Sequence, residues 1–353
     1  MTSRRARPVA PERSTQRVLI VDDSAVARAV LTRMVADTAG CSVAAAVPDV
    51  PSALAFLTAE MVDVILLDLE MPGIDGLTAM PDLLAAGAGA KVLVVSSIAG
   101  DGAAVTVEAL ALGAADTLVK PGHYVTAGSF ARALAEKLAR LGERTEPVAP
   151  LLTRGGASPR DFDMVAIGAS TGGIHALTSL FQALPPSFTA PIAVTQHLPA
   201  AFMPHFARQM AAATGRRCEI ASDRLVPANN MIVIAPGDAH LVATPLPTGG
   251  AAMRLSRTPV PNGNLPSVDP MFETLAECFG PRLLAIVLSG MGRDGLQGAA
   301  RVRQRGGTLV VQDQASSVVW GMPGAVVRAG LADAVLSPEE IGRFVGQYQV
   351  AAA

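Results

Sequence analysis

Short apolar runs alternate with stretches of helical periodicity along most of the chain. In residues 17–141 the runs are Val18–Val21, Ser42–Val47, Val62–Leu67, Lys91–Val95 and Thr117–Val119. Between the first two, Ser24–Val35 places Val26, Val30 and Met34 on one helical face. This alternation predicts a five-stranded parallel sheet with helices on both faces, the doubly wound α/β arrangement.

The alternation resumes at Asp163. Longer apolar runs predict strands at Met164–Ile167, Pro191–Gln196, Leu283–Leu288 and Thr308–Val311. Shorter runs between Pro and Gly turns, at Met231–Ala235, His240–Ala243 and Met253–Ser256, predict a small antiparallel patch. A helix is expected over Val268–Phe279 with Ser267 as its N-cap. The second half is therefore predicted to be another doubly wound α/β domain.

The segment between the halves has little apolar periodicity and contains Pro147, Pro150, Pro159 and the pair Gly155–Gly156. Such composition is typical of a tether. We therefore predict a tail at residues 1–15, a first domain at 16–141, a linker at 142–160 and a second domain at 161–350. The two domains are expected to fold separately, so that any control acts through their interface.

Composition narrows the function classes. The net charge of −2 does not indicate nucleic-acid binding, and no helix-turn-helix pattern follows the linker. The exception is a basic cluster in the N-terminal tail, made of Arg4, Arg5, Arg7 and Arg13. No apolar run is long enough for a membrane helix, and no apolar segment follows the basic N-terminus as in a signal peptide. The three cysteines are far apart and form no C-x-x-C pair, which is typical of free thiols in a reducing compartment; they are Cys41, Cys218 and Cys278. We expect a cytoplasmic, monomeric protein.

Polar residues follow the predicted strands of the first half. Asp22 and Asp23 follow the first strand, Asp68 the third, Ser96 the fourth and Lys120 the fifth. Carboxyl ends of parallel strands share one edge, where ligands collect. Three converging carboxylates suit a hard cation such as Mg²⁺, and a lysine with a hydroxyl suits a phosphoryl group. The alternative is that Asp23 and Ser24 cap a helix while Lys120 pairs with one acid at the surface.

The motifs V-D-D-S, L-D-L-E-M-P-G-I-D-G, V-S-S and V-K-P resemble the receiver domains of bacterial two-component response regulators, over residues 16–141. The resemblance implies that a histidine kinase donates a phosphoryl group to Asp68. It also implies that Asp22 and Asp23, with Asp68, hold Mg²⁺ while Ser96 and Lys120 contact the phosphoryl oxygens.

Two further features come from the same comparison. The resemblance implies a cis peptide bond between Lys120 and Pro121. Thr117 stands where many receivers carry an aromatic switch residue. The output side of the switch therefore departs from the usual pattern.

The second half opens with a glycine-rich turn, Gly168-Ala169-Ser170-Thr171-Gly172, between a predicted strand and a predicted helix. The letters fit the nucleophile elbow G-x-S-x-G, although such a turn can equally cradle an anion or serve packing alone. His197 and Asp294 also follow parallel-type strands, so the three side chains can meet in one crevice. A serine needs a base, and the base needs an acid that orients it.

Two rival arrangements use other residues. In the first, His240 and Asp238 complete a triad with Ser170 in the chain order Ser-Asp-His. The simpler interpretation of His240 is that it is a surface or capping residue, and the same holds for His123, His175 and His205. The run from Gly290 to Gly295 fits the dinucleotide fingerprint G-x-G-x-x-G, with Asp313 as the ribose-binding acid. Against that reading, Asp294 in the turn would repel a pyrophosphate.

The motifs G-A-S-T-G-G, Q-H-L-P, I-A-P-G-D-A-H, P-S-V-D, L-S-G-M-G-R-D-G and V-W-G-M-P resemble the chemotaxis protein-glutamate methylesterase (CheB) family, which places this domain behind a receiver. The resemblance implies Ser170 as nucleophile, His197 as general base and then acid, and Asp294 as the residue that orients it. It makes the N–H groups of Met291 and Thr171 candidates for the oxyanion hole. No cofactor is implied for this site.

The implied substrates are methylated glutamates on methyl-accepting chemotaxis receptors, with glutamine deamidation as a second activity. One segment departs from the pattern. Pro261–Leu265 lacks the basic and histidine residues that the family commonly carries there, which puts substrate choice in doubt. We expect the unphosphorylated receiver to cover the Ser170 crevice. The alternative functions are a receiver-controlled adaptor, which would not need an intact triad, and a DNA-binding regulator.

Overall fold

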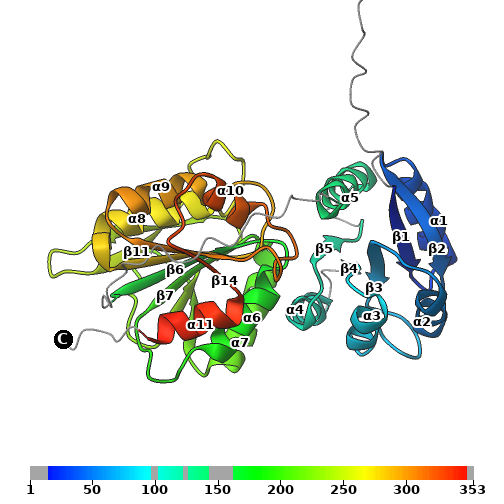
Figure 1. Ribbon diagram of the computed structural model, residues 1–353, viewed down its shortest axis with the longest axis horizontal. Coiled ribbons are helices and arrows are strands. Elements are labelled where there is room, and N and C mark those ends of the chain that lie inside the picture. The colour runs from blue at the N-terminus through cyan, green and yellow to red at the C-terminus, as the bar shows by residue number, and fades with distance from the viewer. Residues whose placement is uncertain (1–14, 97–101, 122–125, 143–161, 348–353) are drawn as a thin grey trace, which may run out of the picture.

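The computed structural model describes residues 15–96, 102–121, 126–142 and 162–347. Nearly all of the predicted tail and of the predicted linker lies outside these ranges, as does His123. Two parallel sheets organise the described residues, one in each half of the chain (Figure 1). No helix in these ranges is long and apolar enough to cross a bilayer.

The first sheet has five parallel strands in the order β2-β1-β3-β4-β5, as the alternation predicted. Its strands are β1 (Gln16–Val21), β2 (Cys41–Val47), β3 (Val64–Asp68), β4 (Lys91–Ser96) and β5 (Asp116–Val119). Its helices are α1 (Ala25–Ala36), α2 (Val50–Ala59), α3 (Met80–Ala86), α4 (Gly102–Leu112) and α5 (Ala127–Leu141). Val26 and Val30 of α1 face solvent, whereas Leu31 and Val35 are buried against α5, so the core face of α1 differs from the predicted one.

The second sheet has seven parallel strands in the order β14-β13-β12-β6-β7-β9-β8. These are β6 (Met164–Ala169), β7 (Ile192–Gln196), β8 (Arg217–Ile220), β9 (Met231–Ile234), β12 (Leu283–Val287), β13 (Thr308–Gln312) and β14 (Ala334–Leu336). Figure 1 shows α8 (Val268–Phe279), α9 (Leu296–Gln304) and α10 (Met322–Arg328) on one face. The other face carries α6 (Gly173–Ala183), α7 (Met203–Thr214) and α11 (Pro338–Gly346), and two 3₁₀ turns, η1 (Ala200–Phe202) and η2 (Gly280–Arg282), precede α7 and β12.

The antiparallel patch is smaller than predicted. It consists of β10 (His240–Pro245) and β11 (Ala251–Ser256), which pair with each other. The third predicted member, β9, instead pairs in parallel with β7 and β8. All four residues of β9 are buried, which fits an inner strand of a parallel sheet rather than a half-solvated hairpin.

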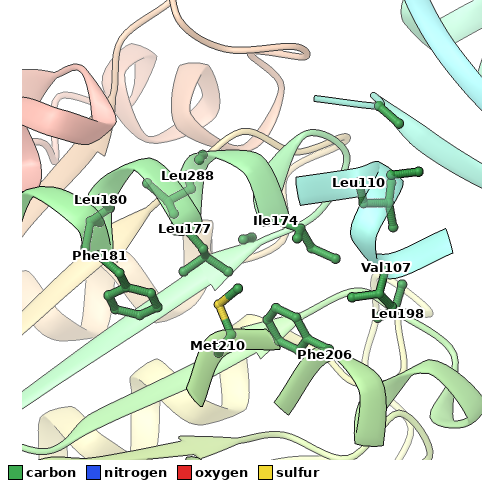
Figure 2. Close-up of a cluster of buried hydrophobic side chains, with 14 of the residues drawn as sticks. Val107, Leu110, Ile174, Leu177, Leu180, Phe181, Leu198, Phe206, Met210 and Leu288 are labelled. Atoms are coloured by element: carbon green, nitrogen blue, oxygen red, sulfur yellow. The ribbon is translucent and has the colours of Figure 1, made fainter. Parts of the chain in front are cut away.

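The two halves pack against each other through α4 of the first and α6, α7 and η1 of the second. Figure 2 shows Val107 and Leu110 of α4 beside Ile174, Leu198 and Phe206. All five side chains are buried, and they belong to one continuous apolar cluster. Because Leu198 directly follows His197, this interface reaches the edge of the candidate active site.

Candidate active site

The turn Ser170–Gly173, here called the elbow, lies at the carboxyl end of β6, a central strand between β12 and β7. The Ser170 N–H donates to the carbonyl of Ser289 (3.0 Å). Gly172 has φ of 74°, and a Cβ there would lie 2.6 Å from Val318 and 2.9 Å from the Ser289 hydroxyl. Only glycine fits such a backbone at so close an approach. The sequence therefore forces a sharp turn that presents Ser170 at the sheet edge.

His197 and Asp294, far apart in the chain, are hydrogen-bonded. His197 follows β7, Asp294 follows β12, and His197 Nε2 lies 2.7 Å from Asp294 Oδ2. The Asp294 side chain is fully buried and that of His197 is 18% exposed. Because Nε2 faces the carboxylate, it carries the proton, and Nδ1 of the neutral ring keeps a free lone pair. The pair is thus arranged with Nδ1 as the base.

A dense set of donors fixes the Asp294 carboxylate. Its oxygens accept hydrogen bonds from the Val268 N–H (2.8 Å), the Ser267 hydroxyl (2.7 Å) and the Asn262 amide (2.8 Å). The N–H groups of Asp269 and Gly295 also donate to it. Ser267 therefore starts α8 without capping it by its side chain, because its hydroxyl is directed to Asp294 instead.

Two neighbouring acids have opposite pKa shifts. Burial alone would raise the pKa of Asp294, but the hydrogen bond and charge of His197, with the Val268 and Ser267 donors, outweigh it and hold this pKa below its ordinary value. Burial, with the Asp294 charge nearby, raises the pKa of Asp269 to about 7. Asp294 therefore loses its proton at a lower pH than Asp269.

Gln196, the last residue of β7, bridges the backbones of the two predicted catalytic residues. Its amide nitrogen donates to the carbonyls of Ser170 (2.9 Å) and His197 (3.3 Å). The side chain is 3% exposed, and its carbonyl oxygen, which lies against Gly173, has no partner among the described residues. Gln196 therefore fixes the spacing between the elbow and the histidine loop.

The Ser170 hydroxyl is half-buried and hydrogen-bonds to no residue in the described ranges, His197 included. Gly290 lies close to the Ser170 side chain, since a Cβ on Gly290 would be 2.9 Å from the Ser170 Cβ. The N–H groups of Thr171 and Met291 make no hydrogen bond within the described part of the chain. Backbone N–H groups that have no partner and lie near a serine nucleophile can donate hydrogen bonds to an oxyanion.

The structure supports neither of the two rival arrangements, the His240–Asp238 pair and the dinucleotide fingerprint. His240 is 2% exposed, accepts from the Ser267 N–H (2.9 Å) and faces the Thr258 carbonyl (3.0 Å), so its assignment to the surface was wrong. Asp238 pairs with Arg257 instead of His240. In the turn before α9, the Asp294 carboxylate accepts from the Gly295 N–H, where a pyrophosphate would need to sit. Neither rival matches the structure.

The residues predicted to form a phosphoryl site lie at the carboxyl edge of the first sheet. Ligand oxygens of Asp22, Asp23 and Asp68 lie within 4.8 Å of one another. Lys120 Nζ contacts Asp68 Oδ2 at 2.6 Å, and both Asp68 and the Ser96 side chain are 3% exposed. Burial, with the Asp68 charge adding to it, raises the pKa of Asp22, whose Oδ2 has no partner among the described residues. An orphaned buried carboxylate oxygen beside two further acids fits a divalent cation.

Two details of this first site differ from the sequence predictions. The Lys120–Pro121 bond is not cis; the cis bond in the described ranges is Leu265–Pro266. Lys120 contacts Asp68 with the Lys120–Pro121 bond in the trans form. The alternative of a surface ion pair is also wrong, because the acid that Lys120 contacts is buried.

The first half touches the elbow itself. Asp116 Oδ2 accepts from the Thr171 hydroxyl (2.6 Å), and the Ala115 carbonyl accepts from the Gly172 N–H (2.7 Å). On the opposite loop, the Arg140 guanidinium approaches the Met291 sulfur at 3.7 Å. The first half therefore holds residues on both sides of Ser170.

Sequence reasoning missed Gln196, Asn262, Ser267 and Asp116 as parts of the site. Gln196 stands next to His197, and Ser267 belongs to the P-S-V-D motif, so both carried a signal. Asn262 lies in the divergent Pro261–Leu265 segment, where only its missing charge drew attention. Asp116 offered no motif at all, because its partner Thr171 is 55 positions away.

Comparisons with known proteins agree with this architecture. The CheB methylesterase family model matches residues 165–345, and the response regulator receiver domain model matches residues 18–125. Protein-glutamate methylesterase/protein-glutamine glutaminase 2 of Caulobacter vibrioides is 41% identical over 342 residues, covering 93% of this chain and 97% of that protein. The corresponding protein of Azospirillum brasilense is 38% identical over 96% of this chain and 93% of that protein.

A solved structure extends the likeness to the second half. The CheB methylesterase catalytic domain of Thermotoga maritima superimposes with a TM-score of 0.51 at 34% identity, covering 53% of this chain and 99% of that one. The relatives span almost the whole sequence, and each of the two family models matches one of the two halves that the sheets define. The chain belongs to the CheB methylesterase family, with a response regulator receiver domain ahead of its methylesterase domain.

Proposed function

We propose that the protein is a phosphorylation-activated hydrolase that demethylates glutamate methyl esters on chemoreceptors and deamidates glutamine side chains. The observation that carries the proposal is the 2.7 Å hydrogen bond between His197 and the buried Asp294, beside a serine on a glycine-forced elbow. Relatives named protein-glutamate methylesterase/protein-glutamine glutaminase support the choice of substrate.

The chemistry follows the proton. His197 Nδ1 removes the proton of the Ser170 hydroxyl as its oxygen attacks the γ-carbonyl of the methyl ester, and Asp294 stabilises the imidazolium. The Met291 and Thr171 N–H groups donate to the oxyanion that forms. When the C–O bond to methanol breaks, Nδ1 returns the proton to the departing methoxide oxygen. A water then repeats the cycle on the glutamyl-serine ester and releases glutamate and Ser170.

The same steps act on a glutamine amide. The leaving group becomes ammonia, which takes the proton from Nδ1, and the glutamyl-serine ester is common to both reactions. Because that intermediate is identical, hydrolysis of the acyl-enzyme is expected at the same rate for both substrates. Differences between them then reside in the acylation step.

The receiver domain is proposed to accept a phosphoryl group on Asp68 from a histidine kinase. Asp22 and Asp23, together with Asp68, would hold Mg²⁺, which offsets the negative charge of the phosphoryl group when bound. Lys120, which contacts Asp68 at 2.6 Å, and Ser96, at the end of the neighbouring strand β4, are proposed to contact the phosphoryl oxygens. The orphaned Oδ2 of Asp22 supports this assignment.

Autoinhibition is proposed to act on the elbow itself. Asp116 and Ala115 hold Thr171 and Gly172, so the receiver constrains the residues that must bind the oxyanion and blocks access from that side. Thr117, next to Asp116, lies 3.3 Å from the Ser96 hydroxyl. A Ser96 hydroxyl that turns to a phosphoryl group gives up this contact, which links phosphorylation to the strand that carries Asp116.

The test is methanol release from membranes containing methylated receptors. Ser170→Ala and His197→Ala are expected to lower the rate by about a thousandfold or more, because a triad acts as a unit. Ser222→Ala, at an exposed serine of the same domain, serves as the matched control and should keep the wild-type rate. Near wild-type release by either triad variant would contradict the proposal and leave the adaptor hypothesis.

A further inference from the structure

We propose that a pocket beside His197, bounded by Leu265, is a substrate subsite for an apolar side chain of the receptor, next to the methylated glutamate. This inference rests on the proposed function, because it names a second determinant of the same substrate. An acidic receptor surface would call for basic residues at Pro261–Leu265, and this chain has none there. The proposed subsite instead takes an apolar side chain.

The pocket adjoins the candidate active site through His197. It has a volume of about 420 Å³, and His197 forms part of its wall. Its apolar walls are Leu198, Pro199, Leu265 and Pro266. A substrate whose ester reaches Ser170 can therefore place a neighbouring side chain in this pocket, on the side of His197.

Among the residues that line the pocket in the described ranges, His197 is the one whose side chain can carry a charge. None of the residues that line it in the described ranges is Asp, Glu, Lys or Arg. A carboxylate inserted there would lose water without gaining a cation, which is unfavourable, whereas an apolar side chain gains from burial. The chemistry of the walls thus selects for apolar and against acidic occupants.

Leu265 is exposed for 49% of its surface, yet the loop that carries it is anchored. Asn262 in that loop donates to Asp294 Oδ1 at 2.8 Å and to the Ser267 hydroxyl at 3.2 Å. Pro266, the next residue, is buried. Leu265 therefore stands at a fixed place relative to the catalytic pair, and the free face of its side chain is available to a substrate.

The expected occupant follows from helix geometry. On a helical substrate, side chains three and four positions apart lie on the same face at about 5–6 Å between Cβ atoms. A methylated glutamate directed at Ser170 therefore brings a residue three or four positions away to the neighbouring wall. We assign the pocket to an apolar residue at that spacing.

The experiment uses the full-length enzyme with a small phosphoryl donor and Mg²⁺, and helical peptides that each carry one glutamate γ-methyl ester. The peptides differ only in Leu, Gln or Glu at three or four positions before or after the ester. The wild type is expected to give a kcat/KM about tenfold higher for Leu than for Glu at one of these positions. Leu265→Arg should reverse that order, and Leu265→Glu should widen the gap by disfavouring the Glu peptide further.

Val226→Arg is the matched control, because Val226 is likewise an exposed apolar residue (53%) but lies outside this pocket. It should leave the peptide preference unchanged, and the melting of all variants is followed by Trp320 fluorescence. Equal kcat/KM for Leu, Gln and Glu peptides, or a preference that both Leu265 variants retain, would overturn the subsite. Failure of the enzyme to hydrolyse any peptide or any receptor ester would instead contradict the proposed function.

Discussion

Replacing Asp116 with alanine removes the receiver acceptor for the Thr171 hydroxyl, a contact of 2.6 Å. The same carboxylate pairs with Lys137 at 2.6 Å, but Lys137 belongs to the receiver too, so that pair persists whether or not the domains separate. Of the Asp116 contacts described here, the one to Thr171 crosses between the domains and is lost on opening. The substitution therefore weakens the closed state selectively.

The size of the effect follows from the type of bond. A hydrogen bond to a charged group contributes about 1.5–3 kcal/mol, and the lower end applies because the Asp116 side chain is 17% exposed. About 1.4 kcal/mol changes an equilibrium tenfold. If the closed state dominates without phosphate, Asp116→Ala should raise basal esterase activity about tenfold, and phosphorylation should then add less than it does in the wild type.

The assay is methanol release from methylated receptor membranes without a phosphoryl donor. Asp116→Asn keeps an oxygen acceptor for Thr171 without the charge, so its basal rate should fall between those of the wild type and Asp116→Ala. Asp82→Ala, at an exposed carboxylate of α3, is the control and should match the wild type. A basal rate for Asp116→Ala at or below that of the wild type would refute the reasoning.

Three other predictions follow from the same structure. Gln196→Leu should lower kcat by about ten- to a hundredfold with little change in KM, because it loosens the spacing between Ser170 and His197; a change confined to KM would contradict this. The raised pKa of Asp269 means that the folded protein keeps a proton the unfolded chain has lost, so Asp269 makes stability fall between about pH 4 and 7 and level off above. Denaturation followed by Trp320 fluorescence should show Asp269→Asn gaining on the wild type by on the order of 3 kcal/mol across that window, whereas parallel curves would count against the assignment. Removal of Mg²⁺ by a chelator, or Asp22→Asn with Mg²⁺ present, should abolish most of the alkali-labile acyl phosphate on Asp68; undiminished phosphate in both would exclude the acidic cluster as the cation site.

The apolar pattern predicted most of the fold because buried parallel strands are nearly continuous apolar runs. It failed where burial is incomplete or the strand is short. The edge strand β8 includes Arg217 and Glu219, and β14 has three residues, so neither stands out as an apolar run. The strand β9 was placed in the antiparallel patch because its neighbours β7 and β8 cannot be inferred from spacing alone.

The site was predictable to the extent that strand ends define it. Ser170, His197 and Asp294 each follow a parallel strand, and the structure brings the latter two into contact. His240 was misplaced because its partners, Ser267 and Thr258, come from the loop that returns after β11. Contacts of this kind depend on loop conformation, which the periodicity of the strands does not encode.

The hydrogen bonds between the receiver and the elbow could not be predicted from the sequence for the same reason. The sequence predicted two separately folding domains and a receiver that covers the Ser170 crevice, but not which receiver residues make the contact. The Thr171–Asp116 and Gly172–Ala115 hydrogen bonds depend on how α4 packs against α6 and α7. No local pattern at Asp116 distinguishes it from an ordinary strand-start acid.

The most direct test of the account measures methanol release from methylated receptors with and without a small phosphoryl donor and Mg²⁺, for the wild type, Asp68→Ala and Ser170→Ala. The account predicts donor-stimulated release by the wild type, unstimulated release by Asp68→Ala and none by Ser170→Ala. Release by Ser170→Ala at the wild-type rate, or equal stimulation of Asp68→Ala, would contradict it.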